Sequence, residues 1–148
     1  MNERFLSRGK REDNGAWETG FLVIKRWDCS DERYFITDKM TGYHTSVIPK
    51  TVGKGTELKD KHGKMIFKGD ILESRASENK EDWKRWVVTF SDGSFCFERE
   101  IPRKRKYKYE QNLLGIDNIE LYGLTVIGNV HDNPKLLQRS DENEKIDR

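Results

Sequence analysis

The segment from residue 47 to residue 73 constrains the fold of this chain more than any other part of the sequence. It reads VIPKTVGKGTELKDKHGKMIFKGDILE, so short β-prone pieces alternate with Gly53, Gly55, Gly63 and Gly69. Glycine adopts backbone angles that other residues resist, and each of these positions therefore allows a sharp turn. Short strands separated this closely by glycine turns predict a small barrel or sandwich.

Strand patterns continue on both sides of this segment. Gly20 to Trp27 and Arg33 to Thr37 are rich in β-branched and aromatic residues, which predicts two strands joined by a polar turn. Further along, Trp83 to Phe90 and Ser94 to Glu98 flank an Asp-Gly pair, which is a strong hairpin signal. Leu124 to Val130 predicts a last strand, so the chain is expected to be mostly β.

The C-terminal part carries a different signal. Asp132 to Leu137 predicts one short helical turn, because Asp132 or Asn133 can cap it and Pro134 suits its first position. The tail over residues 138–148 is charged and is predicted to be disordered.

At 148 residues the chain is about one domain long. The sequence predicts a single compact domain over residues 1–137, or two small β lobes divided near the polar stretch 74–82. Only 34% of the residues are apolar, so aromatic side chains must supply much of the core. We therefore expect Trp17 and Trp27 to be ordinary core residues.

Composition also predicts a compartment. Cys29 and Cys96 are the only cysteines and are far apart, which favours buried thiols in a reducing cytosol over a disulfide framework. The first residues, MNERFLSRGKRED, lack the apolar run of a signal peptide, and no stretch approaches the length of a membrane span. The expected location is the cytoplasm, with no membrane contact.

The sequence proposes no catalytic, cofactor or metal site. The glycines of residues 53–63 lack the spacing of a phosphate-binding loop, and turns explain them better. Neither cysteine has a recognisable base, and no spacing gathers metal ligands from the residues considered, which are His44, His62, His131, Asp60, Asp70 and Asp132. Asp70 is expected to accept backbone N–H bonds in its turn. We expect the protein not to be an enzyme.

A basic cluster is the strongest candidate binding site. Its cations could contact phosphates and its tyrosines could stack on bases; the members are Arg99, Arg103, Lys104, Arg105, Lys106, Tyr107, Lys108 and Tyr109. A solvated edge strand explains the same residues, because lysine and arginine block edge-to-edge pairing. The net charge of the chain is only +2, so the edge-strand interpretation is favoured.

Three blocks of the sequence resemble the YopX family of phage and prophage proteins. The first block contains Ile48-Pro49, Thr51-Val52-Gly53, Leu58-x-Asp60-x-x-Gly63, and Phe67 followed by Gly69-Asp70-Ile71. The second is VIGNVHDNPKLL at residues 126–137, and the third is SRGKREDNGAWETGFLV at residues 7–23. The resemblance implies a mostly β fold, as a small SH3-like barrel or sandwich with a short C-terminal helical turn, and homo-oligomerisation. It implies no activity, cofactor or catalytic residue.

Two hypotheses for function follow. The favoured one is a phage or prophage accessory protein that is not an enzyme and acts through contacts with its own copies and with a phage or host protein. The alternative is a nucleic-acid-binding protein that uses the basic segment 99–109.

Overall fold

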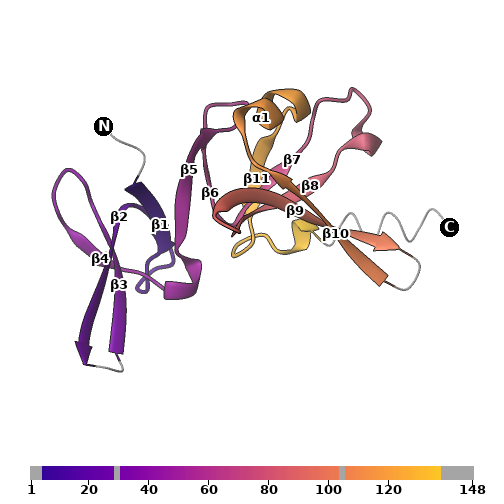
Figure 1. The fold of residues 1–148 in the computed structure, drawn as a ribbon. Coiled ribbons are helices and arrows are strands. Elements are labelled where there is room, and N and C mark those ends of the chain that lie inside the picture. Colours follow the sequence, from indigo (N-terminus) through magenta and orange to yellow (C-terminus); the bar gives the residue numbers. More distant parts are fainter. Residues whose placement is uncertain (1–4, 29–30, 104–105, 138–148) are drawn as a thin grey trace. The chain divides into compact units, whose positions relative to one another are not determined.

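The structure, a computed structural model, describes residues 5–28, 31–103 and 106–137, and the side chains among them outside residues 100–109 (Figure 1). The chain divides into two compact units, Met1–Glu57 and Leu58–Arg148. The polar stretch 74–82, where the sequence suggested a division between lobes, lies inside the second unit. The predicted disordered tail, residues 138–148, lies outside the described residues.

The first unit is an antiparallel sheet built around one long hairpin. Its strands lie in the order β4-β3-β2-β1-β5, and β5 runs across the division between the units. The elements are β1 (Leu6–Lys10), β2 (Trp17–Asp28), β3 (Asp31–Thr37), β4 (His44–Ser46), the short 3-10 helix η2 (Pro49–Thr51) and β5 (Gly53–Lys59).

Glycine residues allow close packing in the core of this sheet. Leu6, Ile36 and Val47 are buried, and Gly9 lies against the Val47 side chain. A Cβ atom on Gly20 would lie 2.2 Å from the carbonyl oxygen of Thr37, so no larger residue fits there without moving the strand. The core of the first unit therefore depends on glycine as much as on aliphatic side chains.

The second unit contains an antiparallel sheet in the order β10-β9-β8-β7-β11. The elements are β6 (Met65–Phe67), β7 (Asp70–Glu73), the 3-10 helix η3 (Lys80–Asp82), β8 (Arg85–Ser91), β9 (Ser94–Arg103), β10 (Lys106–Leu113), α1 (Ile116–Tyr122) and β11 (Thr125–Asn129). Figure 1 shows β9 strongly curved as it crosses the sheet. The prediction of a mostly β fold is confirmed, whereas the SH3-like barrel stays a prediction.

One hydrophobic cluster fills the second unit. Trp86 and Phe97 meet edge to face with their ring centroids 4.6 Å apart, and α1 covers them with Ile119. The other buried members are Ile66, Leu72, Val88 and Leu124. Cys96 is buried beside this cluster, as the sequence predicts, and Cys29 lies outside the described residues.

Local turn signals account for most boundaries in this unit. Asp92 and Gly93 both have positive φ, at 53° and 79°, which confirms the predicted Asp-Gly hairpin turn. α1 begins after Gly115 and ends at Gly123, whose φ of 56° is typical of a helix C-cap. The predicted C-terminal helical turn is also present, with the Leu137 N–H donating to the carbonyl oxygen of Pro134.

Polar residues of the family-like blocks form what we call the turn network: Asp60, Asp70, Asn129 and Asn133. Asp60 Oδ1 accepts the backbone N–H groups of His62 and Lys64, each at 2.9 Å, and its Oδ2 accepts that of Val126 at 2.9 Å. Asp70 accepts the Phe67 N–H at 2.8 Å, as its sequence context predicts. These carboxylates therefore hold loops in shape.

Asn129 and Asn133 do the same at the end of β11. Asn129 Oδ1 accepts the N–H groups of His131 and Asp132, at 3.0 and 2.9 Å, and Asn133 Oδ1 accepts that of Asn129 at 3.3 Å. A Cβ atom on Gly128 would lie 2.6 Å from Asn133 Oδ1, so glycine leaves room for this arrangement.

Candidate functional site

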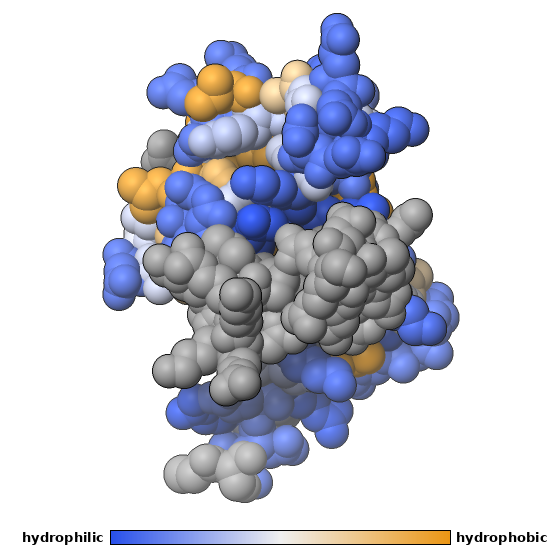
Figure 2. Space-filling model, turned by 90° about the vertical axis from the view of Figure 1, so that its right-hand side faces the viewer, coloured by the Kyte–Doolittle hydropathy of each residue, from blue (hydrophilic) through white to orange (hydrophobic). Residues whose placement is uncertain are grey.

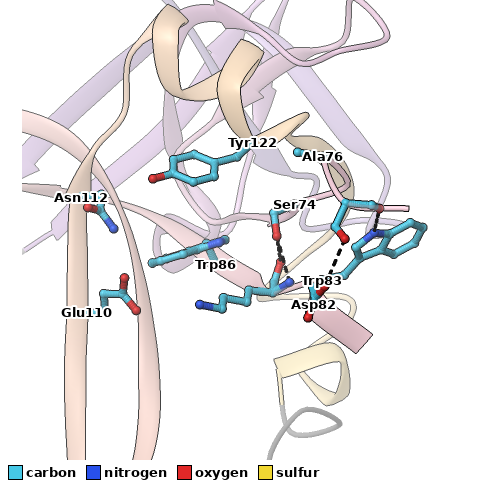
Figure 3. Close-up of a pocket in the computed structure, with 10 residues that line it drawn as sticks. Ser74, Ala76, Asp82, Trp83, Trp86, Glu110, Asn112 and Tyr122 are labelled. Carbon is cyan, nitrogen blue, oxygen red and sulfur yellow. Dashed lines mark hydrogen bonds between the residues drawn. The ribbon is translucent and has the colours of Figure 1, made fainter. Parts of the chain in front are cut away.

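A pocket of about 250 Å³ opens in the second unit (Figure 3). Its walls come from β8, β10, α1 and the loop that joins β7 to β8, and the residues that matter most are Ser74, Lys84, Trp86, Glu110, Asn112 and Tyr122. Figure 3 shows the rings of Tyr122 and Trp86 on two sides of the pocket and Asn112 and Glu110 along a third.

The hydrophobic cluster fixes the aromatic walls. Trp86 is only 5% exposed and packs on Phe97, and the Tyr122 ring also meets Phe97, at 6.4 Å between centroids. On Trp86 lies the guanidinium of Arg99, with its Cζ 5.5 Å from the ring centroid. Phe97 therefore contacts both rings and links the two walls.

The loop wall is fixed by its own hydrogen bonds. The Ser74 N–H donates to the carbonyl oxygen of Lys84, and the Lys84 N–H donates back to Ser74 Oγ, both at 2.9 Å. Trp83 Nε1–H donates to the Ser77 carbonyl at 2.8 Å, and Ser77 Oγ–H donates to Asp82 at 3.1 Å. The pocket is therefore a preformed feature of the unit.

A buried ion-pair cluster anchors this loop at its base. Glu73 accepts from Arg75 Nε at 2.8 Å with one oxygen and from Arg85 Nε at 2.9 Å with the other. Burial by itself would raise the pKa of Glu73, but the hydrogen bonds from Arg85 and Arg75 outweigh it and lower the pKa below its ordinary value. Arg85 also donates to the carbonyl oxygen of Leu136 at 2.8 Å, which ties the C-terminal helical turn to β8.

The predicted basic cluster lies on the hairpin of β9 and β10. Arg99 has a described side chain; it pairs with Glu110 at 3.2 Å and lies over Trp86, so its charge is engaged inside the unit. The backbone register pairs Arg103 with Lys106 and Pro102 with Tyr107. Lys104 and Arg105 lie outside the described residues, as do the side chains of Arg103, Lys106, Tyr107, Lys108 and Tyr109.

The scattered histidines and carboxylates occupy separate places. His44 Nδ1 lies 2.6 Å from Thr37 Oγ1, whereas His62 and His131 are exposed in loops. Among the described residues, no three His, Cys, Asp or Glu side chains gather as metal ligands would. Sequence reasoning missed Asn112 and Tyr122, because they lie in segments without a recognised motif.

A second feature is the far end of the β2–β3 hairpin. We call it the hairpin face, and it comprises Lys25, Trp27, Asp28, Asp31, Arg33 and Phe35. Trp27 is 60% exposed and meets Phe35 edge to face at 6.4 Å. Lys25 Nζ lies 5.5 Å from the Phe35 centroid, and Arg33 Cζ lies 5.7 Å from that of Trp27.

The expectation that Trp27 is a core residue is wrong. β1 pairs with β2 only at residues 17–21, and β4 pairs with β3 only at residues 35–37, so the hairpin continues beyond its neighbours as a two-stranded ribbon. The register also shifts between Arg26 and Asp28, at Trp27 itself. The β-prone sequence around Trp27 predicts correctly that the residue lies in a strand. It does not show that no neighbouring strand covers this end of the hairpin.

One face of the molecule is mainly polar. Figure 2 shows a face whose coloured atoms are largely hydrophilic, with hydrophobic side chains in small separate areas. Among the described residues, no helix has the length and apolar character needed to cross a membrane.

Three comparisons with known proteins give the lineage of the fold. A family model described as YopX protein matches residues 13–138. Among solved structures, the chain is similar to the crystal structure of protein EF1440 from Enterococcus faecalis, with a TM-score of 0.53 and 22% sequence identity over 88% of this chain and 96% of that chain. No curated protein matches the chain.

Proposed function

The chain belongs to the YopX protein family, and from this premise we propose that it is a non-enzymatic module that assembles with copies of itself. The observation that carries the proposal is the pattern of charge and aromatic groups on the hairpin face. The family resemblance supports the wider setting, an accessory protein of a phage or prophage that works in the cytoplasm of its bacterial host.

The hairpin face is complementary to itself. The β2–β3 ladder sets Lys25 opposite Arg33 and, nearer the tip, Asp28 opposite Asp31. Like charges directly opposite each other in a ladder are unfavourable, and a partner of opposite charge relieves them. Two hairpins that meet antiparallel bring the basic pair of each onto the acidic pair of the other, as a two-fold interface requires.

Trp27 and Arg33 are the residue types that dominate binding at protein interfaces. Trp27 lies between the basic and the acidic pair, 60% exposed, where a second copy would cover it. Its contact with Phe35 limits the conformations of the ring, so little side-chain entropy is lost on association. The aromatic pair supplies the apolar centre of the proposed interface, and the charges supply its register.

The non-enzymatic part of the proposal follows from how the acidic side chains are used. Asp60 and Asp70 are occupied by backbone N–H donors, and Glu73 by two arginines. A carboxylate that is held in this way stabilises a loop and is poorly placed to exchange protons with a substrate. Acid–base catalysis by these residues would first require their structural bonds to break.

Charge reversal tests the interface. We expect wild-type protein to form dimers or larger oligomers at micromolar concentration in light scattering, and both K25E/R33E and D28K/D31K to be monomeric. An equimolar mixture of the two variants should dimerise again, because acids then meet bases at both contacts. The control variant K39E/K50E changes two exposed lysines of the same unit and should behave as wild type. A strictly monomeric wild-type protein would refute the proposal.

Nucleic-acid binding through segment 99–109 remains the second candidate. One backbone observation favours it: the register places Arg103 opposite Lys106, a like-charge pair that phosphate would neutralise. It predicts binding to DNA or RNA that weakens steeply with salt and is reduced when Arg103, Lys104, Arg105 and Lys106 are neutralised. Absence of binding at low ionic strength would exclude it.

A further inference from the structure

We propose that the pocket between Trp86 and Tyr122 binds a planar nitrogen heterocycle that carries an amino group, of the size of a nucleobase or nucleoside. The site lies within the second unit and is independent of the hairpin face. Three properties of the pocket carry the inference: its aromatic walls, its free polar groups and its charge.

The aromatic walls select a flat ligand. The rings of Trp86 and Tyr122 border the space in Figure 3. Tyr122 is 40% exposed and offers its ring for stacking, whereas Trp86, 5% exposed and with the Arg99 guanidinium over it, closes the other side. Flat unsaturated rings stack on aromatic side chains with little regard to sequence or substituent, because every such ring presents a π-face. A volume of about 250 Å³ lies below the usual range of drug-sized pockets and admits one ring system with a small substituent.

The polar side chains of the pocket favour a ligand whose ring edge carries hydrogen-bonding groups. Within the described part of the chain, no group hydrogen-bonds to the side-chain amide of Asn112 or to the hydroxyl of Tyr122, although both line the pocket. An amide donates and accepts side by side, which matches the adjacent ring nitrogen and amino group of adenine or cytosine. These groups are therefore available to a ligand without any loss of protein hydrogen bonds.

The charge of the pocket favours a ligand group that donates hydrogen bonds over one that accepts them. Asp82 and Glu110 contribute carboxylates, whereas Lys84 is the single cation among the described residues that line the pocket. Glu110 shares one oxygen with Arg99 at 3.2 Å, and a carboxylate can accept several further hydrogen bonds. An exocyclic amino group has donors for these oxygens, and a keto group in the same place would face them with a lone pair.

Pairs of nucleosides that differ in an amino or a keto group test the proposed preference for an amino group. Protein labelled with ¹⁵N is titrated with adenosine and cytidine, and in parallel with inosine and uridine, which carry keto groups in place of the amino groups. We expect the amino nucleosides to shift the Trp86 indole N–H and the Asn112 side-chain NH₂ signals and to bind at least about tenfold more tightly. Equal affinity for both classes, or no shift with any nucleoside, would overturn the proposal.

A pair of variants on neighbouring residues locates the site. Asn112→Ala removes the amide that lines the pocket, whereas Gln111→Ala changes the exposed preceding residue of the same strand. Adenosine binding should fall about tenfold in the first and stay unchanged in the second, with equal melting temperatures. Unchanged binding in Asn112→Ala would place any bound nucleoside elsewhere on the protein and would contradict the assignment.

The bound base could belong to a free nucleoside or to an unpaired nucleotide in a strand, and the chemistry of recognition is the same. A short single-stranded oligomer of adenine nucleotides separates the two sources. Tighter binding of the oligomer, with a steep dependence on salt, would identify a strand as the source. Equal affinity for oligomer and adenosine would identify the free nucleoside.

Discussion

The turn network and the pocket use the same kinds of polar side chain in opposite ways. In the turn network, Asp60 accepts three backbone N–H groups and Asn129 accepts two. In the pocket, the side-chain amide of Asn112 lines an open space and has no hydrogen-bond partner among the described residues. A polar residue within a family-like motif can therefore be wholly structural, while one outside any motif is free to meet a ligand.

The largest expected effect comes from breaking the turn network at its most connected residue. Asp60→Ala leaves three backbone N–H groups without their acceptor, and we expect the free energy of unfolding to fall by about 3 kcal/mol. Urea denaturation measures it. Glu78→Ala, which removes an exposed carboxylate from the loop that borders the pocket, is the matched control and should cost less than about 0.5 kcal/mol. Similar losses of free energy of unfolding in both variants would mean that polar side chains of the turn network are no more important for stability than those beside the pocket.

The ion-pair cluster at Glu73 should give the next largest effect and a dependence on pH. Glu73→Gln should lower the free energy of unfolding by about 2 kcal/mol at pH 7, because two arginines lose a buried charged acceptor. The folded-state pKa of Glu73 lies below its ordinary value of 4.5, so this stabilisation is fully present above pH 4.5 and is lost as the pH falls through the folded-state pKa.

Denaturation of wild type and Glu73→Gln at a series of pH values checks this prediction. The gap between the two proteins should be constant from pH 7 to pH 5 and should narrow below about pH 4. A gap that widens in acid would mean that Glu73 is stabilised in its protonated form, contrary to the arginine contacts.

A smaller effect is expected where glycine makes room for the turn network. Gly128→Ala would place a Cβ atom 2.6 Å from Asn133 Oδ1, so the Asn133 side chain must move and lose its bond from the Asn129 N–H, at a cost of about 1.5 kcal/mol. Gly115→Ala is the control, because a Cβ atom there meets nothing within 4 Å. Thermal melts of the two variants compare them directly, and equal melting temperatures would show that the turn yields without cost.

The smallest effect on stability should come from the pocket itself. Asn112→Leu and Tyr122→Phe remove polar groups that have no protein partner among the described residues, and each should change the free energy of unfolding by less than about 0.5 kcal/mol. Urea denaturation checks both variants. A fall in the free energy of unfolding of 2 kcal/mol or more in either variant would mean that these groups stabilise the fold, as those of the turn network do.

Local signals predict much of the fold. Asp92-Gly93 sets a hairpin because both residues tolerate positive φ, and Asp70 is predicted to serve its turn because a carboxylate two to three residues from free N–H groups accepts them. The helix at Ile116–Tyr122 was not predicted, since its seven residues are too few to show a clear period between Gly115 and Gly123.

The candidate site could not be predicted in the same way. Trp86, Asn112 and Tyr122 come from two strands and a helix, and only the order of strands in the sheet brings them together. The exposure of Trp27 depends likewise on which strands end early, and a single strand pattern carries no such information.

The closure of the second sheet has a consequence for how the chain folds as it is synthesised. Each strand pairing of the first unit joins residues within the first 57, so that sheet can form while the remainder is still being made. β7 lies between β8 and β11, and β11 spans residues 125–129. One edge of β7 therefore stays open until residues 125–129 have been made, and in that interval another chain could pair with it. Newly made protein is thus expected to be most prone to aggregation just before β11 emerges.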